Sequence, residues 1–135
     1  DGKTIGQLPL ETFVGDCYVA RHEGDVTAED AEAMLQKARD ASAAQRILIA
    51  GKATVTEAAA QVFAKADIRL LGNESQTFGP ESGPQQVHLI LLGAGLALLE
   101  GLVLTNVEEG RYFLSAAPLN LGSFEGAPCR AILIR

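Results

Sequence analysis

The sequence contains no cluster of basic residues. Its 11 Lys and Arg stand against 17 Asp and Glu, which gives a formal net charge of -6. Nucleic acids and anionic membranes attract proteins through concentrated positive charge, so the composition argues against both as partners. Hydrophobic residues make up 47% of the 135 positions, as is typical of a globular chain. We interpret residues 1–135 as a single domain that is large enough to bury a core.

Cysteine occurs only at Cys17 and Cys129, and these positions lack the spacing of a metal site. We therefore expect free, buried thiols in a reducing compartment, with a single disulfide as the alternative. We recognise no signal peptide, and we expect a cytoplasmic location.

Membrane and nucleotide-binding signatures are also missing. The longest apolar run, residues 89–104, is short for a membrane span, contains Glu100 and is interrupted by three glycines, so we interpret it as core. The segment around Gly93 and Gly95 lacks the third glycine of a dinucleotide-binding fingerprint, and no Walker loop is present. The sequence shows no tandem repeat and no low-complexity segment.

What the sequence does contain is an alternation of helical and strand patterns. Residues 25–41 show the clearest helical pattern. Thr27 can cap this helix, with Asp30 three positions further on. Crossover helices between short apolar strands predict an α/β fold with a parallel or mixed sheet. The predicted strands are residues 17–20, 46–50, 68–71, 96–99, 111–116 and 129–134, the first of them after a turn at 15–16. The predicted helices are residues 25–41, a segment from Thr54 or Thr56 to about residue 66, and residues 85–93.

Three segments are predicted to be irregular. Residues 1–11 and 119–126 show no periodicity. The polar loop at residues 73–84 follows a predicted buried strand, and the carboxyl ends of such strands are where open α/β sheets usually bind ligands. The loop is either a ligand-binding loop or a solvated connection.

His88 and Glu100 lie twelve positions apart in an otherwise apolar stretch. Burying an ionisable group without a partner is costly, so both side chains need an explanation. Each one could be satisfied by a neighbour or by solvent at the end of its element. Alternatively, both could bind one metal ion, since imidazole and carboxylate are ordinary metal ligands. They are predicted at a helix start and a strand end, so only the tertiary fold decides whether they meet.

Residues 87–135 resemble the carboxyl-terminal part of the cyclase family of metal-dependent hydrolases, which includes bacterial kynurenine formamidases. Residues 1–14 and 68–80 are also similar to segments of that family. The matching motifs are His88, Glu100-Gly101-Leu102, Val107 with Gly110 and Tyr112, Pro118 to Leu121, and Gly126 to Ala131.

The resemblance implies a swivelling β/β/α fold with a mixed sheet flanked by helices, usually assembled as a homo-oligomer. It implies hydrolysis of a formamide or cyclic amide by metal-activated water, with His88 and Glu100 as ligands to zinc or manganese. Glu100 would then also be the catalytic residue. Gln76 is a candidate substrate contact, and its alternative role is that of an ordinary loop residue. The rival function is a non-catalytic scaffold or oligomerisation form.

The sequence departs from the family pattern in one major respect. The family carries the motif His-x-Gly-Thr-His-x-Asp-x-Pro-x-His just before the segment that resembles residues 1–11, and this sequence does not contain it. Catalytic metals take three or more protein ligands, so we expect an incomplete domain that is inactive alone. His22 matches no ligand position, and we expect it at the surface. Two smaller departures also occur. Glu74 and Thr77 occupy the positions at which many relatives have Asp-x-x-Ser, and Gly6 occupies a position at which aspartate is common.

Overall fold

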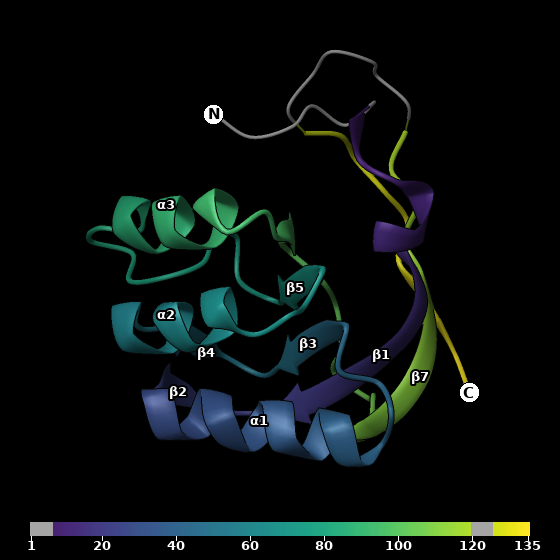
Figure 1. Ribbon diagram of the computed structural model, residues 1–135, viewed down its shortest axis with the longest axis horizontal. Helices are drawn as coiled ribbons and strands as arrows, with labels where there is room; N and C mark the ends of the chain where they lie inside the picture. Colours follow the sequence, from purple (N-terminus) through teal and green to yellow (C-terminus); the bar gives the residue numbers. More distant parts are fainter. Residues whose placement is uncertain (1–6, 120–125) are drawn as a thin grey trace.

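The computed structural model describes residues 7–119 and 126–135 (Figure 1). Residues 1–6 and 120–125 lie outside the described part, and with them Gly6 and much of the predicted irregular segments 1–11 and 119–126. Six strands form one mixed sheet in the order β6-β5-β3-β1-β7-β8. Their bounds are Val14–Arg21 (β1), Arg46–Ala50 (β3), Leu70–Asn73 (β5), Ala97–Leu99 (β6), Gly110–Ser115 (β7) and Ile132–Ile134 (β8).

The helices α1 (Ala28–Asp40), α2 (Glu57–Lys65) and α3 (Gln85–Gly93) lie side by side on one face of this sheet (Figure 1). Strands β1, β3, β5 and β6 are parallel neighbours, whereas β7 and β8 add antiparallel at one edge. The predicted α/β class, of the swivelling β/β/α type with a mixed sheet flanked by helices, is confirmed. No helix in the described part of the chain is long and apolar enough to cross a bilayer.

The start of α1 follows from its local sequence. The Asp30 amide donates to Thr27 Oγ1 over 3.1 Å, and the Thr27 amide donates to the Asp30 carboxylate over 2.9 Å. This reciprocal cap satisfies two amides that a helix start otherwise leaves unpaired, and such caps contribute about 1 kcal/mol. The helix buries Ala31, Met34 and Leu35 against the sheet.

Several element boundaries differ from the predictions, and those of the first two helices differ because two short strands were not predicted. Helix α1 begins at Ala28 rather than at residue 25, because Gly24–Val26 forms β2 and pairs in parallel with β4 (Ala53–Val55). Thr54 lies within β4, so Thr56 is the cap of α2. Strand β5 is shifted by two residues relative to the predicted 68–71. Strands of three residues, such as β2 and β4, are too short to show an alternation of apolar and polar residues in the sequence.

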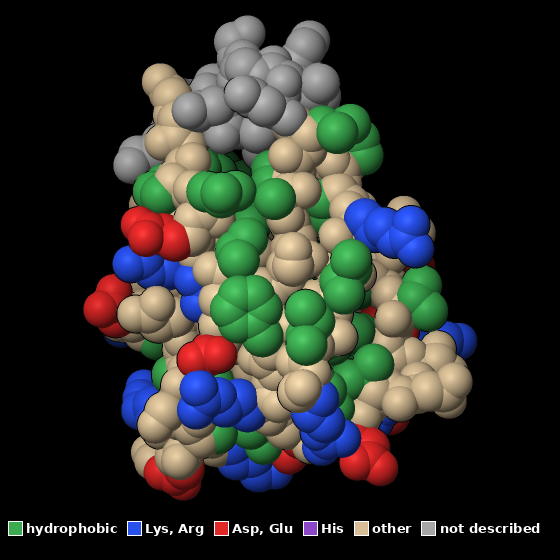
Figure 2. All heavy atoms as spheres, turned by 90° about the vertical axis from the view of Figure 1, so that its right-hand side faces the viewer, with side chains coloured by type: hydrophobic (Ala, Val, Ile, Leu, Met, Phe, Trp, Pro, Cys, Tyr) green, Lys and Arg blue, Asp and Glu red, His purple; other side chains and the backbone are tan. Residues whose placement is uncertain are grey.

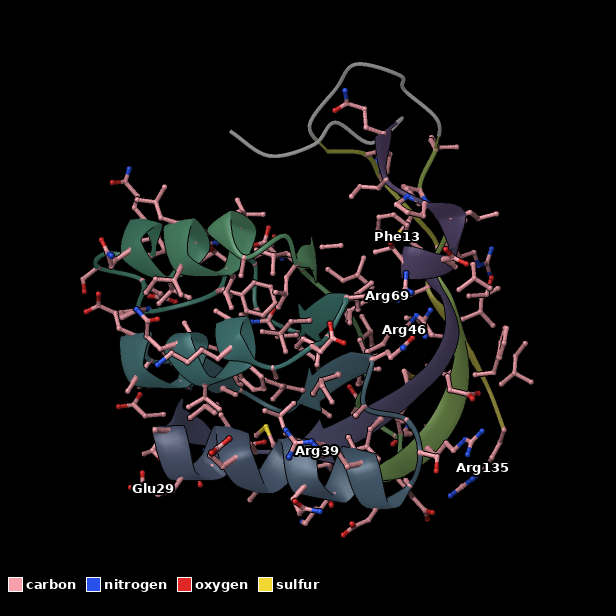
Figure 3. The ribbon with its side chains drawn as sticks, in the orientation of Figure 1. Phe13, Glu29, Arg39, Arg46, Arg69 and Arg135 are labelled. Atoms are coloured by element: carbon pink, nitrogen blue, oxygen red, sulfur yellow. The ribbon has the colours of Figure 1, made fainter. Side chains whose placement is uncertain are left out.

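Gly15 and Asp16 do not form the predicted turn but lie inside β1. They pair there with Leu114 and Phe113 of β7. The Arg46 side chain lies against this part of β1 (Figure 3), and a Cβ on Gly15 would fall 2.5 Å from Arg46 Nη1. Arg46 is only 5% exposed, and its guanidinium donates to the carbonyls of Thr12 (3.2 Å), Asp16 (3.0 Å) and Glu11. One buried cation thereby joins β3 to β1 and to the 3₁₀ helix Leu10–Thr12.

Replacing Arg46 with methionine should lower the free energy of unfolding by about 2–4 kcal/mol, because three carbonyls lose a charged donor. Arg39→Met, on the exposed face of α1, is the matched control and should change the free energy of unfolding by no more than about 0.5 kcal/mol. Urea denaturation measures both. Equal stabilities of the two variants would contradict the role given to Arg46.

The two cysteines occupy different environments. Both are free, as predicted, but only Cys17 is buried, so the prediction that Cys129 is also buried is wrong. Cys129 precedes β8 and forms only an isolated bridge with Pro118, and its side chain is exposed there. Burial raises the pKa of the Cys17 thiol to about 12.

Iodoacetamide at pH 8 should therefore alkylate Cys129 and spare Cys17 in the native protein. A thiol with its pKa near 12 is almost entirely protonated at this pH, and the thiolate is the reactive form. Mass spectrometry of tryptic peptides gives the readout, and alkylation in guanidinium, where both thiols react, is the control. Native labelling of Cys17 at the same rate as Cys129 would be inconsistent with this packing.

Candidate functional site

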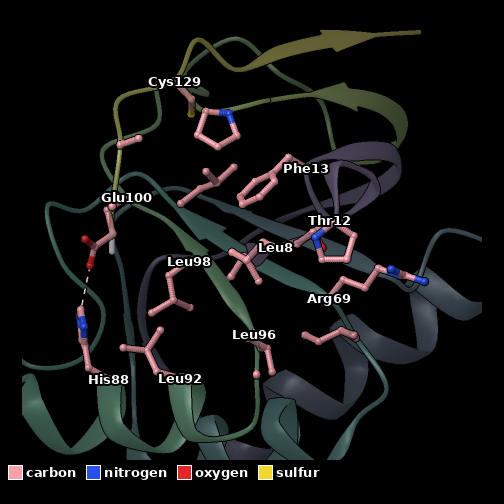
Figure 4. Close-up of a pocket in the computed structure, with 18 of the residues that line it drawn as sticks. Leu8, Thr12, Phe13, Arg69, His88, Leu92, Leu96, Leu98, Glu100 and Cys129 are labelled. Carbon is pink, nitrogen blue, oxygen red and sulfur yellow. Dashed lines mark ion pairs between the residues drawn. The ribbon is translucent and has the colours of Figure 1, made fainter. Parts of the chain in front are cut away.

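His88 and Glu100 meet in the folded chain. His88 lies in the first turn of α3, and Glu100 directly follows β6. A tight turn that contains Gly95 (φ +84°) reverses the chain between these elements, so the helix start lies beside the strand end. His88 Nε2 is 3.2 Å from Glu100 Oε2 (Figure 4). The two side chains are 29% and 34% exposed, so they are open to a small ligand.

The 3.2 Å distance between His88 Nε2 and Glu100 Oε2 is compatible with a direct hydrogen bond and with shared binding of a metal ion. A protonated imidazole would make a charge-assisted hydrogen bond over this distance. Two ligands of one tetrahedral zinc, each about 2.1 Å from the ion, lie about 3.4 Å apart, close to the observed separation. The donor types and their separation therefore fit a divalent cation. Within residues 7–119 and 126–135, however, no three His, Cys, Asp or Glu side chains are grouped to hold one.

The pair borders a cavity of about 630 Å³. His88 and Glu100 lie on one side of it and Arg69 on the opposite side (Figure 4). Cys129 also lines the cavity. Apolar side chains from α3, β6 and the segment before β1 line the space between, among them Leu8, Phe13, Leu92, Leu96 and Leu98. A cavity of this size and lining can hold a small molecule with an apolar body and a polar group at the His88 end.

The loop after β5 contacts the imidazole directly. Thr77 Oγ1 lies 2.7 Å from His88 Nε2, and the Phe78 backbone amide lies 3.4 Å from the same atom. The buried Phe78 ring also stands edge-on to the imidazole, with ring centroids 6.3 Å apart. Sequence reasoning missed the Thr77 contact. One feature of the sequence could have indicated it: Thr77 carries a hydroxyl at a position where many members of the family that this sequence resembles have serine.

Glu74 has a structural role. Its carboxylate accepts from the Gly51 amide over 2.6 Å and from the Leu104 amide over 2.8 Å. It thereby joins the loop after β5 to the segments that follow β3 and β6. The Gly101 amide donates to the Ser75 carbonyl over 2.8 Å, which fixes the residue after Glu100 to the same loop.

Gln76 is exposed and lies beside the Glu100 segment: its Nε2 would be 3.9 Å from a Cβ placed on Gly101. It is not among the residues that line the cavity, and its contact with substrate stays a prediction. His22 is partly exposed and also lies outside the cavity lining. Its Nε2 is 2.8 Å from the Asp25 carbonyl in β2 and 3.5 Å from the Asp30 carboxylate in the first turn of α1.

No protein-family model matches the chain. The kynurenine formamidase of Salinibacter ruber is 31% identical over 144 residues, which cover 98% of this chain and 68% of that protein. The structure of a potential metal-dependent hydrolase with cyclase activity superposes with a TM-score of 0.81 at 28% identity, covering 94% of this chain and 68% of that one. A predicted metal-dependent hydrolase from Bacillus stearothermophilus gives a TM-score of 0.78 at 28% identity, covering 98% and 69%. With this identity spread over nearly the whole chain and two thirds of its relative, the chain belongs to the cyclase family of metal-dependent hydrolases, together with the kynurenine formamidases.

Proposed function

We propose that this chain carries part of the active site of a metal-dependent amide hydrolase, with His88 and Glu100 as metal ligands. The observation that supports the proposal is the 3.2 Å pair at the side of the cavity, formed by the two donor types that zinc and manganese accept. The name of the Salinibacter ruber relative suggests a formamide substrate.

In this proposal the chain's residues have distinct tasks. A bound divalent ion would supply Lewis acidity toward an amide carbonyl and a water molecule. Glu100 can also accept a proton from the attacking water at a carboxylate oxygen, which makes it the candidate catalytic residue. The leucines of the cavity hold the apolar body of the substrate and exclude bulk water. Gln76, beside Gly101, is the candidate polar contact at the rim.

Two ligands do not hold a catalytic metal tightly, because such sites use three or more protein ligands. We therefore propose that further ligands come from residues other than those described, as in the histidine-rich motif of the family. The chain alone is then expected to bind metal weakly and to be inactive, and a cytoplasmic location remains our prediction. The alternative function is a scaffold that keeps the fold without the metal site.

His88→Ala and Glu100→Gln should each weaken binding of zinc or manganese by about tenfold or more, because either change removes one of two ligands. Equilibrium dialysis with elemental analysis measures the bound metal. His22→Ala is the matched control, since it deletes a histidine outside the cavity, and should bind as the unaltered chain does. If the unaltered chain takes up no metal even at millimolar supply, the scaffold alternative is favoured.

We also propose that the chain associates with a second copy of itself through the outer face of β7 and β8. Phe113 pairs with Ile134 across these strands, and Phe113, Ile132 and Ile134 are 42%, 47% and 53% exposed. Hydrophobic side chains gather in the middle of this face, with acidic and basic side chains around them (Figure 2). Both charge signs occur beside the apolar centre in the Arg111–Asp16 pair, and Asp16 lies opposite Phe113 across β1 and β7. A face that carries both signs suits a self-complementary contact.

Light scattering after size exclusion should therefore show a dimer or larger assembly, and Phe113→Asp should shift it toward monomer. An unpaired charge at the centre of an apolar contact opposes association. Val103→Asp changes an apolar residue outside this face that is more exposed than Phe113 (83% against 42%), and it serves as the control. A monodisperse monomer for the unaltered chain would rule out this assembly.

A further inference from the structure

The contacts at Nε2 do not by themselves fix the plane of the His88 ring. A histidine ring turns about its Cβ–Cγ bond, a torsion with broad preferences. Nε2 lies close to the axis of that bond, so the contacts with Thr77 Oγ1 at 2.7 Å and Glu100 Oε2 at 3.2 Å restrain the turn only weakly. A metal ion binds an imidazole nitrogen in the plane of the ring, so a metal site also needs a group that holds this plane.

Phe78 stands against the imidazole from a buried position. The two ring centroids are 6.3 Å apart and the ring planes are inclined by 66°, within the range of favourable edge-to-face pairs. Phe78 is fully buried although it belongs to a loop, and it packs in the same apolar cluster as Val87 and Leu91, the buried residues of α3. The aromatic ring is therefore held by the core, and the imidazole leans on it.

The backbone next to Phe78 rests directly on α3. Gly79 has a φ of +84°, and a Cβ on this residue would lie 3.0 Å from Cβ and Cγ2 of Val87, the residue before His88. A side chain at position 79 would push the loop away from the helix, and only glycine adopts this φ without strain. The distance between the Phe78 ring and the imidazole is thus set by main-chain packing.

We propose that Phe78 is a positioning residue, which holds the imidazole plane of His88 so that Nε2 stays directed at Glu100. Without the aromatic ring, the imidazole can turn, and a half-turn would put the carbon Cε1 in the place of Nε2 beside the carboxylate. The inference rests on the proposed function, because the direction of Nε2 matters for a cation that His88 and Glu100 share.

Phe78→Leu tests this role, because it keeps a buried apolar side chain and removes the aromatic ring. Phe63→Leu, at a fully buried position of α2 outside the cavity lining, is the matched control for the loss of core packing. In the metal-free chain, ¹³C relaxation of the His88 ring should show greater mobility in Phe78→Leu and no change in Phe63→Leu. Zinc binding, measured by equilibrium dialysis, should weaken by about threefold to tenfold in Phe78→Leu alone.

A second pair of variants displaces the Phe78 ring without altering it. Gly79→Ala strains a backbone of positive φ and also pushes against Val87. Gly24→Ala imposes the same kind of strain at a φ of +85°, but its Cβ would meet nothing within 4 Å, so it is the matched control. Gly79→Ala should mobilise the His88 ring, and Gly24→Ala should leave it as in the unaltered chain.

Melting temperatures establish which variants are folded. Equal mobility of the His88 ring in the folded Phe78→Leu and Phe63→Leu chains would overturn the proposal, as would an unchanged ring in Gly79→Ala if Phe78→Leu does not fold. A mobile ring with undiminished zinc binding would overturn it too. If the ring is mobilised in Phe78→Leu but the unaltered chain binds no zinc, Phe78 does hold the imidazole and the proposed hydrolase function fails.

Discussion

The contact between His88 and Glu100 depends on a reversal of the chain between α3 and β6. A nine-residue helix followed by a tight turn and a three-residue strand leaves few alternatives for where the two ends lie. Glu100 is held because the residue after it donates to Ser75 and the next residue, Leu102, donates to the Asn73 carbonyl. The same loop presents Thr77 and Phe78 to the imidazole. The site is thus a product of one loop and one helix–strand unit.

Two charged groups, the buried Arg46 and the partly buried Glu74, fix the rest of the sheet around this unit. Arg46 joins β3 to β1 and to the segment that contains Thr12, which lines the cavity. Glu74 performs a similar task at the carboxyl ends of β3 and β5, where it accepts two backbone amides from other segments. Each group satisfies backbone atoms that would otherwise be left unpaired where strands end. The walls of the cavity are therefore positioned by hydrogen bonds as well as by apolar packing.

Local signals in the sequence predicted much of this fold. Helix α3 has the predicted bounds because a polar, proline-containing loop precedes it and glycines follow it. The buried strand Arg46–Ala50 was evident from its continuous apolar run. In contrast, β2 and β4 are too short to leave a pattern, and Gly15 does not form the predicted turn because its strand partner, Leu114 of β7, is distant in sequence. The sequence could name His88 and Glu100 but could not show that they meet, because contact across a fold is not encoded in spacing along the chain. The Thr77 contact was missed for the same reason.

The central claim is that His88 and Glu100 share a divalent cation. Diffraction data collected at the zinc absorption edge from zinc-soaked crystals would test it most directly. The account predicts an anomalous peak about 2.1 Å from both His88 Nε2 and Glu100 Oε2. A zinc peak elsewhere, with the two side chains still paired to each other, would contradict it.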